Sequence, residues 1–313
     1  MEPASELTPE LRAFVEFVAK KGRELYRDLP WRRTYDPYAI WISEVMLQQT
    51  QVSRVDGRWQ RWLERFPTVD ALAAAAPSDV LEEWQGLGYN RRALSVHRAA
   101  QAISEVGGVF PQDPKELVKL PGIGPATAAG IRAFAFNLHG VYLETNVRTV
   151  FLHELYPQAE GVPDSELVPL VELTCPASVT DAVNADSAAN VANADRTAND
   201  ATAELTPRSW YYALLDYGAY LKKTIHNPSR RSKSHVKQSR FEGSHRQKRA
   251  ELLRVLLAHK DEGGAVFETL HQELCQIEVN AGRETLDEQV TLGLLEELAK
   301  EGFCQKNDEY WLP

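Results

Sequence analysis

One stretch, residues 118–148, constrains the fold of this chain more than any other. Its central turn reads Leu-Pro-Gly-Ile-Gly-Pro, and an alanine-rich run begins directly after it, at Pro125 or Ala126. Proline is pre-organised for the first turn of a helix, while Gly122 and Gly124 allow backbone conformations and close contacts that other residues resist. The stretch therefore predicts two helices joined by a tight turn, with the free N–H groups of the second helix facing outward.

Outward-facing N–H groups at a helix N-terminus form a ready site for a phosphate group. Pro-Gly-x-Gly turns also join helices that bind no ligand, so a purely structural role stays open for the turn alone. A carboxylate, Glu144, follows one helix later at the end of a loop. We therefore formulate the hypothesis that the turn grips a nucleic-acid backbone and delivers a nucleotide to Glu144.

The composition is that of an ordinary protein with a large buried core. At 313 residues, with 43% hydrophobic and 25% charged residues, the chain is long enough for two or three domains. Residues 1–10 are polar, and no apolar run reaches the length of a membrane span, so we expect no signal peptide and a cytoplasmic location. The three cysteines lie far apart without metal-type spacing, which favours reduced thiols.

The charge is distributed unevenly along the chain. The net charge is −9, yet residues 222–249 contain ten Lys or Arg residues against one acid, Glu242. An acidic protein with such a basic strip can still bind DNA, with an affinity that falls as salt rises. A solvated linker would have the same composition, so the basic strip alone does not establish binding.

Hydrophobic periodicity predicts helices along most of the chain. Asp36 and Pro37 supply an N-cap and first-turn signal for a helix expected over residues 38–52. On that helix Glu44 lies within the apolar run Trp-Ile-Ser-Glu-Val-Met-Leu, although an isolated Glu on a helix usually faces solvent. Partial desolvation would raise the pKa of Glu44 and suit it to act as a general acid near neutral pH.

The order of these elements indicates an all-α core of two lobes within residues 1–245. A six-helix lobe spans about residues 36–148, and the second lobe combines residues 1–35 with residues 149–245. Within the second lobe, residues 174–206 are rich in Ala, Asn, Asp and Thr without apolar periodicity, which predicts a flexible insertion.

Residues 246–313 show a different pattern, which predicts a small separate domain. Amphipathic helices are expected over residues 248–258, 266–275 and 287–301, followed by a short hairpin. This order resembles a winged helix. A dimerisation module or a plain helical cap would show a similar pattern.

Two motifs together resemble the helix-hairpin-helix (HhH-GPD) superfamily of DNA glycosylases. The run Leu-Pro-Gly-Ile-Gly-Pro-Ala-Thr-Ala is followed about twenty residues later by a carboxylate-x-Asn-Val-Arg run. The upstream run Trp-Ile-Ser-Glu-Val-Met-Leu-Gln-Gln-Thr-Gln-Val narrows the resemblance to the adenine-specific, MutY-like glycosylases. The resemblance covers about residues 29–227 apart from the insertion.

This resemblance implies an activity and a partner. We expect a monofunctional DNA N-glycosylase of base excision repair, a hydrolase that removes adenine mispaired with 8-oxoguanine or guanine. Its partner is double-stranded DNA with a mispaired or damaged base, and no membrane is involved. A monomer associated with a bacterial nucleoid in the cytoplasm is expected.

The resemblance also assigns residues to the site. Glu44 is expected to protonate the base, Glu144 to balance positive charge on the sugar, and Asn146 to hold the sugar or a water. The base must leave the helical stack to reach them. The base pocket is expected to contain Trp31, Arg32, Gln48 and Asp216. The DNA contacts are expected to be Gln49 and Tyr89 as wedges, Gly122, Gly124, Ala126 and Thr127 in the turn, and Arg230, Arg231 and Lys233 in the basic strip.

Without the resemblance, Tyr89 would be interpreted as a packed aromatic residue and Gln49 as a helix-surface amide. The chain also departs from the family pattern at several positions. Glu144 replaces an Asp, and one extra methylene can displace a charge by roughly 1 Å, enough to slow a reaction about a hundredfold. Ala126 replaces the lysine of bifunctional relatives, so no lysine-based strand cleavage is expected.

A third departure concerns the iron–sulfur cluster that many relatives carry. The four cysteine positions of the family correspond here to Lys222, Ser229, Ser232 and Gln238. Such clusters are held by thiolates, so we expect no cluster and no cofactor. A Nudix-type C-terminal domain, which reads oxidised guanine in the family, is not recognisable in residues 247–313.

Three other functions fit parts of the pattern. The same scaffold can excise another base, such as thymine or uracil in a mismatch. A non-catalytic DNA-binding protein would keep the turn and lose the chemistry through Glu144. A general helical interaction protein would show no salt-dependent affinity for DNA.

Overall fold

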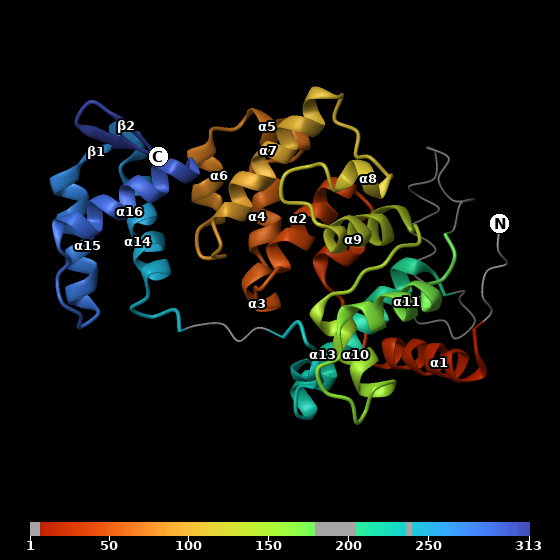
Figure 1. Cartoon of the computed structure of the whole chain (residues 1–313). Helices are drawn as coiled ribbons and strands as arrows, with labels where there is room; N and C mark the ends of the chain where they lie inside the picture. The colour runs from red at the N-terminus through yellow and green to blue at the C-terminus, as the bar shows by residue number, and fades with distance from the viewer. Residues whose placement is uncertain (1–6, 179–204, 236–239) are drawn as a thin grey trace. The chain divides into compact units, whose positions relative to one another are not determined.

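The protein is predominantly helical in the computed structural model, which describes residues 7–178, 205–235 and 240–313 (Figure 1). The all-α expectation is confirmed. The chain packs as two compact units. The first unit contains the described residues of Met1–Val45 and Phe110–Val236. The second unit contains those of Met46–Val109 and Lys237–Pro313.

The first unit is built around one long helix, α13. Its elements are α1 (Pro9–Glu24), η1 (Pro30–Arg33), α2 (Pro37–Leu47, as far as Val45), α8 (Pro114–Leu117), α9 (Pro125–Phe136), α10 (Thr145–Glu154), α11 (Asp164–Thr174), α13 (Pro207–Thr224) and η4 (Pro228–Arg231). Helix α13 packs against α10, α1 and α9. Fully buried Trp210 and Tyr211 on α13, with Phe134 and Phe151, form the centre of this core.

Local sequence signals explain where α13 begins. The side chain of Thr206 accepts a hydrogen bond from the Ser209 N–H, and the side chain of Ser209 accepts one from the Thr206 N–H, which forms a capping box. Pro207 occupies the first helical position, where a missing N–H costs nothing. Close packing on α1 requires Gly22, because a Cβ there would collide with Ala213. The helix is therefore fixed at its start and along its buried face.

The second unit combines five short helices with the C-terminal segment. Its elements are α3 (Val52–Val55), α4 (Arg58–Arg65), α5 (Val69–Ala74), α6 (Pro77–Trp84), α7 (Arg91–Glu105), α14 (His245–Ala258), η5 (Lys260–Glu262), β1 (Ala265–Val266), α15 (Phe267–Asn280), α16 (Glu288–Glu301), β2 (Gln305–Asn307) and β3 (Tyr310–Leu312). The three strands form an antiparallel sheet in the order β1-β3-β2, with Trp311 opposite both Ala265 and Lys306. The predicted C-terminal helices and hairpin are confirmed, and β1 is an addition.

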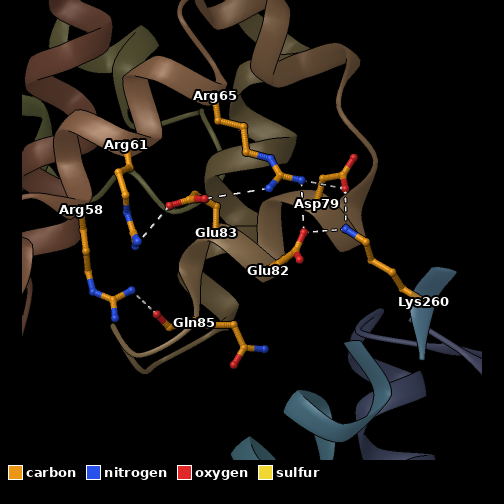
Figure 2. Close-up of polar contacts among 8 residues, drawn as sticks. All are labelled: Arg58, Arg61, Arg65, Asp79, Glu82, Glu83, Gln85 and Lys260. Atoms are coloured by element: carbon orange, nitrogen blue, oxygen red, sulfur yellow. Dashed lines mark hydrogen bonds and ion pairs between the residues drawn. The ribbon is translucent and has the colours of Figure 1, made fainter. Parts of the chain in front are cut away.

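Ion pairs hold the C-terminal segment to α6 and α7. Lys260 pairs with Asp79 at 2.9 Å and with Glu82 at 2.5 Å. Figure 2 shows these contacts, and Arg65 of α4 pairs with the same two acids. Elsewhere in the unit, Glu301 of α16 pairs with Arg91 of α7 and with Arg249 of α14. The hydrogen bond from Arg91, reinforced by Arg249, lowers the pKa of Glu301 to about 2. The C-terminal segment is therefore part of one compact unit with α4–α7.

Some predicted boundaries differ from those in the structure. The helix expected over residues 38–52 ends at Leu47, and Gln49 lies in a turn rather than on a helix surface. The two compact units do not follow the expected lobes, since residues 46–109 group with the C-terminal segment through the ion pairs above. Of the insertion expected at residues 174–206, residues 179–204 lie outside the described residues.

Two further observations concern membranes and thiols. Within the described ranges, no helix combines the length and apolar character that a membrane crossing requires. Cys175, Cys275 and Cys304 are all free, and Cys175 and Cys304 are buried. The expectation of reduced thiols is therefore consistent with the structure.

The ion pairs of Lys260 predict a measurable contribution to stability. Its side chain is only 16% exposed and contacts two carboxylates, so Lys260→Ala removes two charge-assisted hydrogen bonds and is expected to cost about 1–2 kcal/mol. Urea unfolding followed by circular dichroism measures the loss. The matched control is Arg254→Ala on α14, whose pair with Glu251 is 54% exposed on the arginine side; it should cost no more than about 0.5 kcal/mol. Equal losses of stability in the two variants would show that the ion pairs of Lys260 contribute no more than an exposed pair.

Candidate active site

Glu44 lies inside the first unit, with its carboxyl group against the backbone of α9. A Cβ added at Gly130 would lie 2.5 Å from Glu44 Oε2 and 2.9 Å from the Tyr142 ring. Real Cβ atoms essentially never come so close to another heavy atom, so Gly130 leaves the space that the carboxyl occupies. The hydroxyl of buried Tyr142 shares a hydrogen bond with the same carboxyl.

This environment changes the acidity of Glu44. Burial raises the pKa of Glu44 to about 8, and the negative charge of Glu144 acts in the same direction. The hydrogen bond with Tyr142 and the charge of Arg32 oppose the shift without cancelling it. At neutral pH the carboxyl therefore holds a proton, which is the state a general acid requires.

Glu144 occupies the N-cap position of α10, at the end of the loop that follows α9. Burial raises the pKa of Glu144, while the charge of Arg148 and a hydrogen bond with the Thr145 N–H act against that rise. Arg148 is itself fixed by two hydrogen bonds to Asp164, of 2.8 and 2.9 Å. The structure thus brings Glu44 and Glu144 close enough for their charges to interact, as expected from the sequence.

Asn146 is positioned by the close approach of α13 to the first turn of α10. A Cβ at Gly218 would collide with the backbone of Asn146, so glycine is required where these helices meet. The side chain of Asn146 accepts a hydrogen bond from Lys222 Nζ at 3.4 Å. The two residues that flank Thr145 therefore both lie at the N-terminus of α10.

Arg32 and Asp216, both expected in the base pocket, form a buried ion pair with each other. Arg32 donates to both carboxylate oxygens at 2.7 and 2.8 Å, and Arg27 donates to the same two oxygens through its side chain and its backbone N–H. The carboxylate is fully buried and accepts four hydrogen bonds. A carboxylate has about four acceptor positions, so Asp216 has no position left for the exocyclic amine of a base in this structure.

The other residues expected in the base pocket lie in different surroundings. Trp31 is buried beside Arg32 in η1. Gln48 is half-buried and belongs to the second unit, directly after the end of α2. The pocket role of Trp31 and Gln48 stays a prediction.

The two expected wedge residues have an unusual backbone conformation. Gln49 has φ 54° and Tyr89 has φ 50°, values in the left-handed region that side-chain-bearing residues seldom adopt. Both are exposed and lie in the second unit. Such strain persists only when the surrounding structure enforces it, and it is concentrated at functional sites.

Hydrogen bonds from the side chain of Arg92 hold both of these loops. Its guanidinium donates to the carbonyl of Gln48 at 2.7 Å in one loop, and to the carbonyls of Gly88 at 2.9 Å and Leu87 at 3.1 Å in the other. Burial lowers the pKa of Arg92 to about 10. This role was not foreseen from the sequence, since nothing in the pattern distinguishes Arg92 from the neighbouring arginines of α7.

The helix-turn-helix at residues 114–136 has the predicted form. Helix α8 ends before the turn, Gly122 has φ 76°, and α9 begins at Pro125 with Gly124 as its N-cap. Ile123 is buried and anchors the turn, while Gly122 and Gly124 are exposed. Ala126 is half-buried and Thr127 is buried within the first turn of α9. The N–H groups at the start of α9 thus lie beside an exposed turn, as a phosphate contact would require.

Arg231 of the basic strip has a structural partner. Its guanidinium donates to the carbonyls of Leu152, Tyr156 and Pro157, which lie at and beyond the end of α10. Arg230 and Lys233 are exposed, so they are better placed than Arg231 for the predicted phosphate contact.

The residues at the expected cluster positions do not fit an iron–sulfur cluster. Ser229 donates to Asn227 Oδ1 at 2.8 Å, Ser232 accepts from the Ser234 N–H at 3.1 Å, and Lys222 contacts Asn146. The fourth position, Gln238, lies outside the described residues. Ammonium and hydroxyl groups cannot replace the thiolates that hold such a cluster. Across residues 7–178, 205–235 and 240–313, no group of three or more His, Cys, Asp or Glu side chains is arranged to hold a metal ion.

Other residues that shape the pair of carboxyl groups were also not foreseen from the sequence. Tyr142 and Gly218 carry no motif, and Arg148, although it ends the carboxylate-x-Asn-Val-Arg run, had been given no role. Gly130 did offer a signal, because a glycine in the interior of a helix lowers helix stability by about 1 kcal/mol and so suggests a packing reason.

The contact between Gly130 and Glu44 predicts the effect of a single methyl group. Gly130→Ala should favour the helix by about 1 kcal/mol but forces the carboxyl away, so we expect a net loss of stability and a lower pKa for Glu44. The matched control is Gly293→Ala within α16, where nothing lies within 4 Å of the added Cβ, and it should gain up to about 1 kcal/mol. Thermal unfolding and carboxyl ¹³C NMR measure the two effects. A Gly130→Ala protein as stable as Gly293→Ala would contradict the packing argument.

The raised pKa of Glu44 predicts how stability depends on pH. Between its ordinary value of 4.5 and about 8, the native state holds a proton that the unfolded state has lost. The stabilising contribution of Glu44 to the free energy of unfolding is therefore fully present below pH 4.5. It is lost as the pH rises to about 8, by up to about 1.4 kcal/mol per pH unit. Glu44→Gln should remove this slope in urea unfolding measured from pH 5 to 8.

The control for this experiment is Glu24→Gln, which changes an exposed carboxyl on α1 whose pKa is lowered by Lys21. Its stability curve should run parallel to that of the wild type over the same pH range. If the curve of Glu44→Gln is also parallel to the wild type, Glu44 is ionised at neutral pH and cannot serve as the acid.

Comparisons with known proteins agree with this geometry. The family model "HhH-GPD superfamily base excision DNA repair protein" matches residues 42–206, just over half of the chain. The adenine DNA glycosylase of Mycolicibacterium smegmatis is 42% identical over 156 residues, which are 49% of this chain and 53% of that protein. That of Homo sapiens is 39% identical over 134 residues, which are 40% of this chain and 24% of that protein.

Among solved structures, a thermostable thymine-DNA glycosylase superposes with a TM-score of 0.55 at 20% identity, over 70% of this chain and 90% of that one, which supports the fold alone. The chain spans about half the length of the M. smegmatis relative and less of the human one. With the turn, the carboxyl pair and the family match in agreement, the chain belongs to the HhH-GPD superfamily of base excision DNA repair proteins.

Proposed function

We propose that this protein is a monofunctional DNA N-glycosylase of base excision repair that releases adenine from mispairs. The observation that carries the proposal is the pair of interacting carboxyl groups, one of which holds a proton at neutral pH because its pKa is about 8. The curated relatives above, which bear the name adenine DNA glycosylase, support the choice of base.

The two carboxyl groups have complementary tasks in this reaction. Adenine is a poor leaving group, so the bond to the sugar breaks more easily when the base receives a proton, here from Glu44. Positive charge then develops on the sugar, and a fixed carboxylate stabilises it. The helix N-terminus and Arg148 favour the negative charge at Glu144, so the proton of the pair belongs on Glu44.

Residues next to the two carboxyl groups determine how the sugar is held and how the reaction ends. Asn146 lies one residue beyond Thr145 and is fixed by Gly218, so its amide can hold the sugar or the attacking water. Ala126 supplies no amine for a covalent intermediate, and the reaction therefore ends with hydrolysis at the sugar. Glu144 has a longer side chain than the family's Asp, and the charge of Arg148 lies near enough to favour its ionised form.

The finer assignments belong to the same proposal. DNA binds through the turn at Gly122–Gly124 and through the exposed Arg230 and Lys233. The preferred mispairs contain 8-oxoguanine or guanine opposite the adenine, and the protein works without an iron–sulfur cluster. The donor set at Lys222, Ser229 and Ser232 supports the last point, since none of these side chains is a thiolate.

The proposal predicts base release from particular duplexes. Wild-type protein should release adenine opposite 8-oxoguanine or guanine, but not opposite thymine, in an assay that cuts the product with alkali. Glu44→Gln and Glu144→Gln should each slow release by at least about a hundredfold. Glu144→Asp should retain more activity than Glu144→Gln, because it keeps the charge.

Glu24→Gln, the same substitution at an exposed carboxyl, is the control and should leave release unchanged. Release of thymine or uracil without adenine would refute the adenine assignment. Tight binding without release of any base would show that the protein is a non-catalytic DNA-binding member of the family.

A further inference from the structure

An exposed stack of alternating cations and aromatic rings lies in the second unit, where the C-terminal segment meets the turn that carries Tyr89. The guanidinium of Arg246 lies 5.8 Å from the ring centre of Tyr89 and 5.4 Å from that of Phe241. Arg246 also donates a hydrogen bond to the Tyr89 hydroxyl at 3.5 Å. Arg92 lies 5.6 Å from the Tyr89 ring, so two cations flank this tyrosine. Residues 237–313 lie beyond the region that the family model matches.

Both aromatic rings reach the surface. Tyr89 is 41% exposed and Phe241 is 51% exposed. An isolated exposed aromatic residue needs no explanation, but two that share one guanidinium form a continuous surface of ring faces and cationic edges. This combination is the one that proteins use to stack the bases of single-stranded nucleic acid.

The stack is held in place from both sides. Arg92 fixes the carbonyls of Leu87 and Gly88, directly before Tyr89. On the other side, Ser244 caps α14, and its N–H donates to the Phe241 carbonyl. Arg249, one turn into α14, pairs with Glu301, which also binds Arg91 of α7. The rings are thus presented by elements that ion pairs lock together, so little ordering is needed on binding.

The charge of this segment suits a polyanion. Residues 240–249 contain Arg240, Arg246, Lys248 and Arg249 against Glu242 alone among acids, in a protein whose net charge is −9. Of these cations, Arg240 pairs with Glu242, and Arg249 pairs with Glu297 and Glu301. A local excess of cations next to exposed rings favours nucleic acid over an acidic peptide, because only the former also supplies flat bases for the rings.

We propose that Tyr89, Arg246 and Phe241 form a base-stacking surface that binds an unpaired nucleobase of DNA. The base stacks on the ring of Phe241, while the guanidinium between the two rings reinforces both faces through cation–π attraction. The C-terminal segment thereby takes part in DNA recognition together with the turn of Tyr89. The inference rests on the proposed function only for the choice of DNA as ligand.

The test compares two duplexes that differ only in one base. Each carries a one-nucleotide bulge, with thymine in one and an abasic analogue in the other, and fluorescence anisotropy measures binding by the full chain. Phe241→Leu, which keeps an apolar side chain without a π face, should weaken binding to the thymine bulge about tenfold and change binding to the abasic bulge less than twofold. Phe241→Trp should bind both duplexes as the wild type does.

Arg246→Met keeps the length of the side chain without its charge and should also weaken binding to the thymine bulge about tenfold. Arg254→Met on the same helix is the matched control and should change neither affinity, because Arg254 pairs with Glu251 within α14. The melting temperature of each variant shows that it is folded.

Three outcomes would overturn the inference. Phe241→Leu could bind the thymine bulge as tightly as the wild type, Arg246→Met could weaken both duplexes equally as a simple phosphate contact does, or the wild type could bind neither duplex. Failure of the proposed function is a separate result, because a protein that binds the thymine bulge through Phe241 but releases no adenine would refute only the activity.

Discussion

The contact between the Glu44 carboxyl and the backbone of Gly130 is the constraint on which the site depends. A carboxyl group can remain protonated at neutral pH only if it is withdrawn from water, and that requires space inside a packed core. Glycine provides the space on α9, Tyr142 supplies a hydrogen bond, and α13 fixes the loop that carries Glu144 through Gly218. The arrangement of the two carboxyl groups thus depends on two glycines within helices, where glycine weakens the helix itself.

In the second unit, too, an unfavourable local backbone conformation is maintained by contacts with the surrounding structure. Gln49 and Tyr89 both have left-handed backbone conformations, which cost of order 1 kcal/mol or more for a residue with a side chain. Arg92 joins the two loops by donating to carbonyls of both, and its buried position lowers its pKa to about 10. Arg92 therefore joins the two loops in which Gln49 and Tyr89 have this backbone conformation, together with Thr50 and Trp84, which bond the same carbonyls.

The sequence predicted the elements that depend on local signals. The Leu-Pro-Gly-Ile-Gly-Pro turn, the start of α9 at Pro125 and the Asp36 cap of α2 follow from backbone chemistry within a few residues, and the structure has all three. The acidity of Glu44 was also predictable in direction, because its apolar neighbours in sequence implied burial. The four hydrogen bonds to Asp216 were not predictable, since Arg27 and Arg32 lie more than 180 residues away in the chain. The hydrogen bonds from Arg92 to the two loops were not predicted, because they go to backbone carbonyls, which carry no sequence signal.

The segment after α13 is anchored by hydrogen bonds that involve the backbone of its neighbours. Here the guanidinium of Arg231 binds three carbonyls at and beyond the end of α10, and Val162 pairs with the same segment through the Arg231 carbonyl and the Lys233 N–H. Several hydrogen bonds to and from the backbone thus anchor this segment. Because these contacts use the backbone, they do not depend on the side chains at positions 229 and 232, and Arg230 and Lys233 remain exposed beside them.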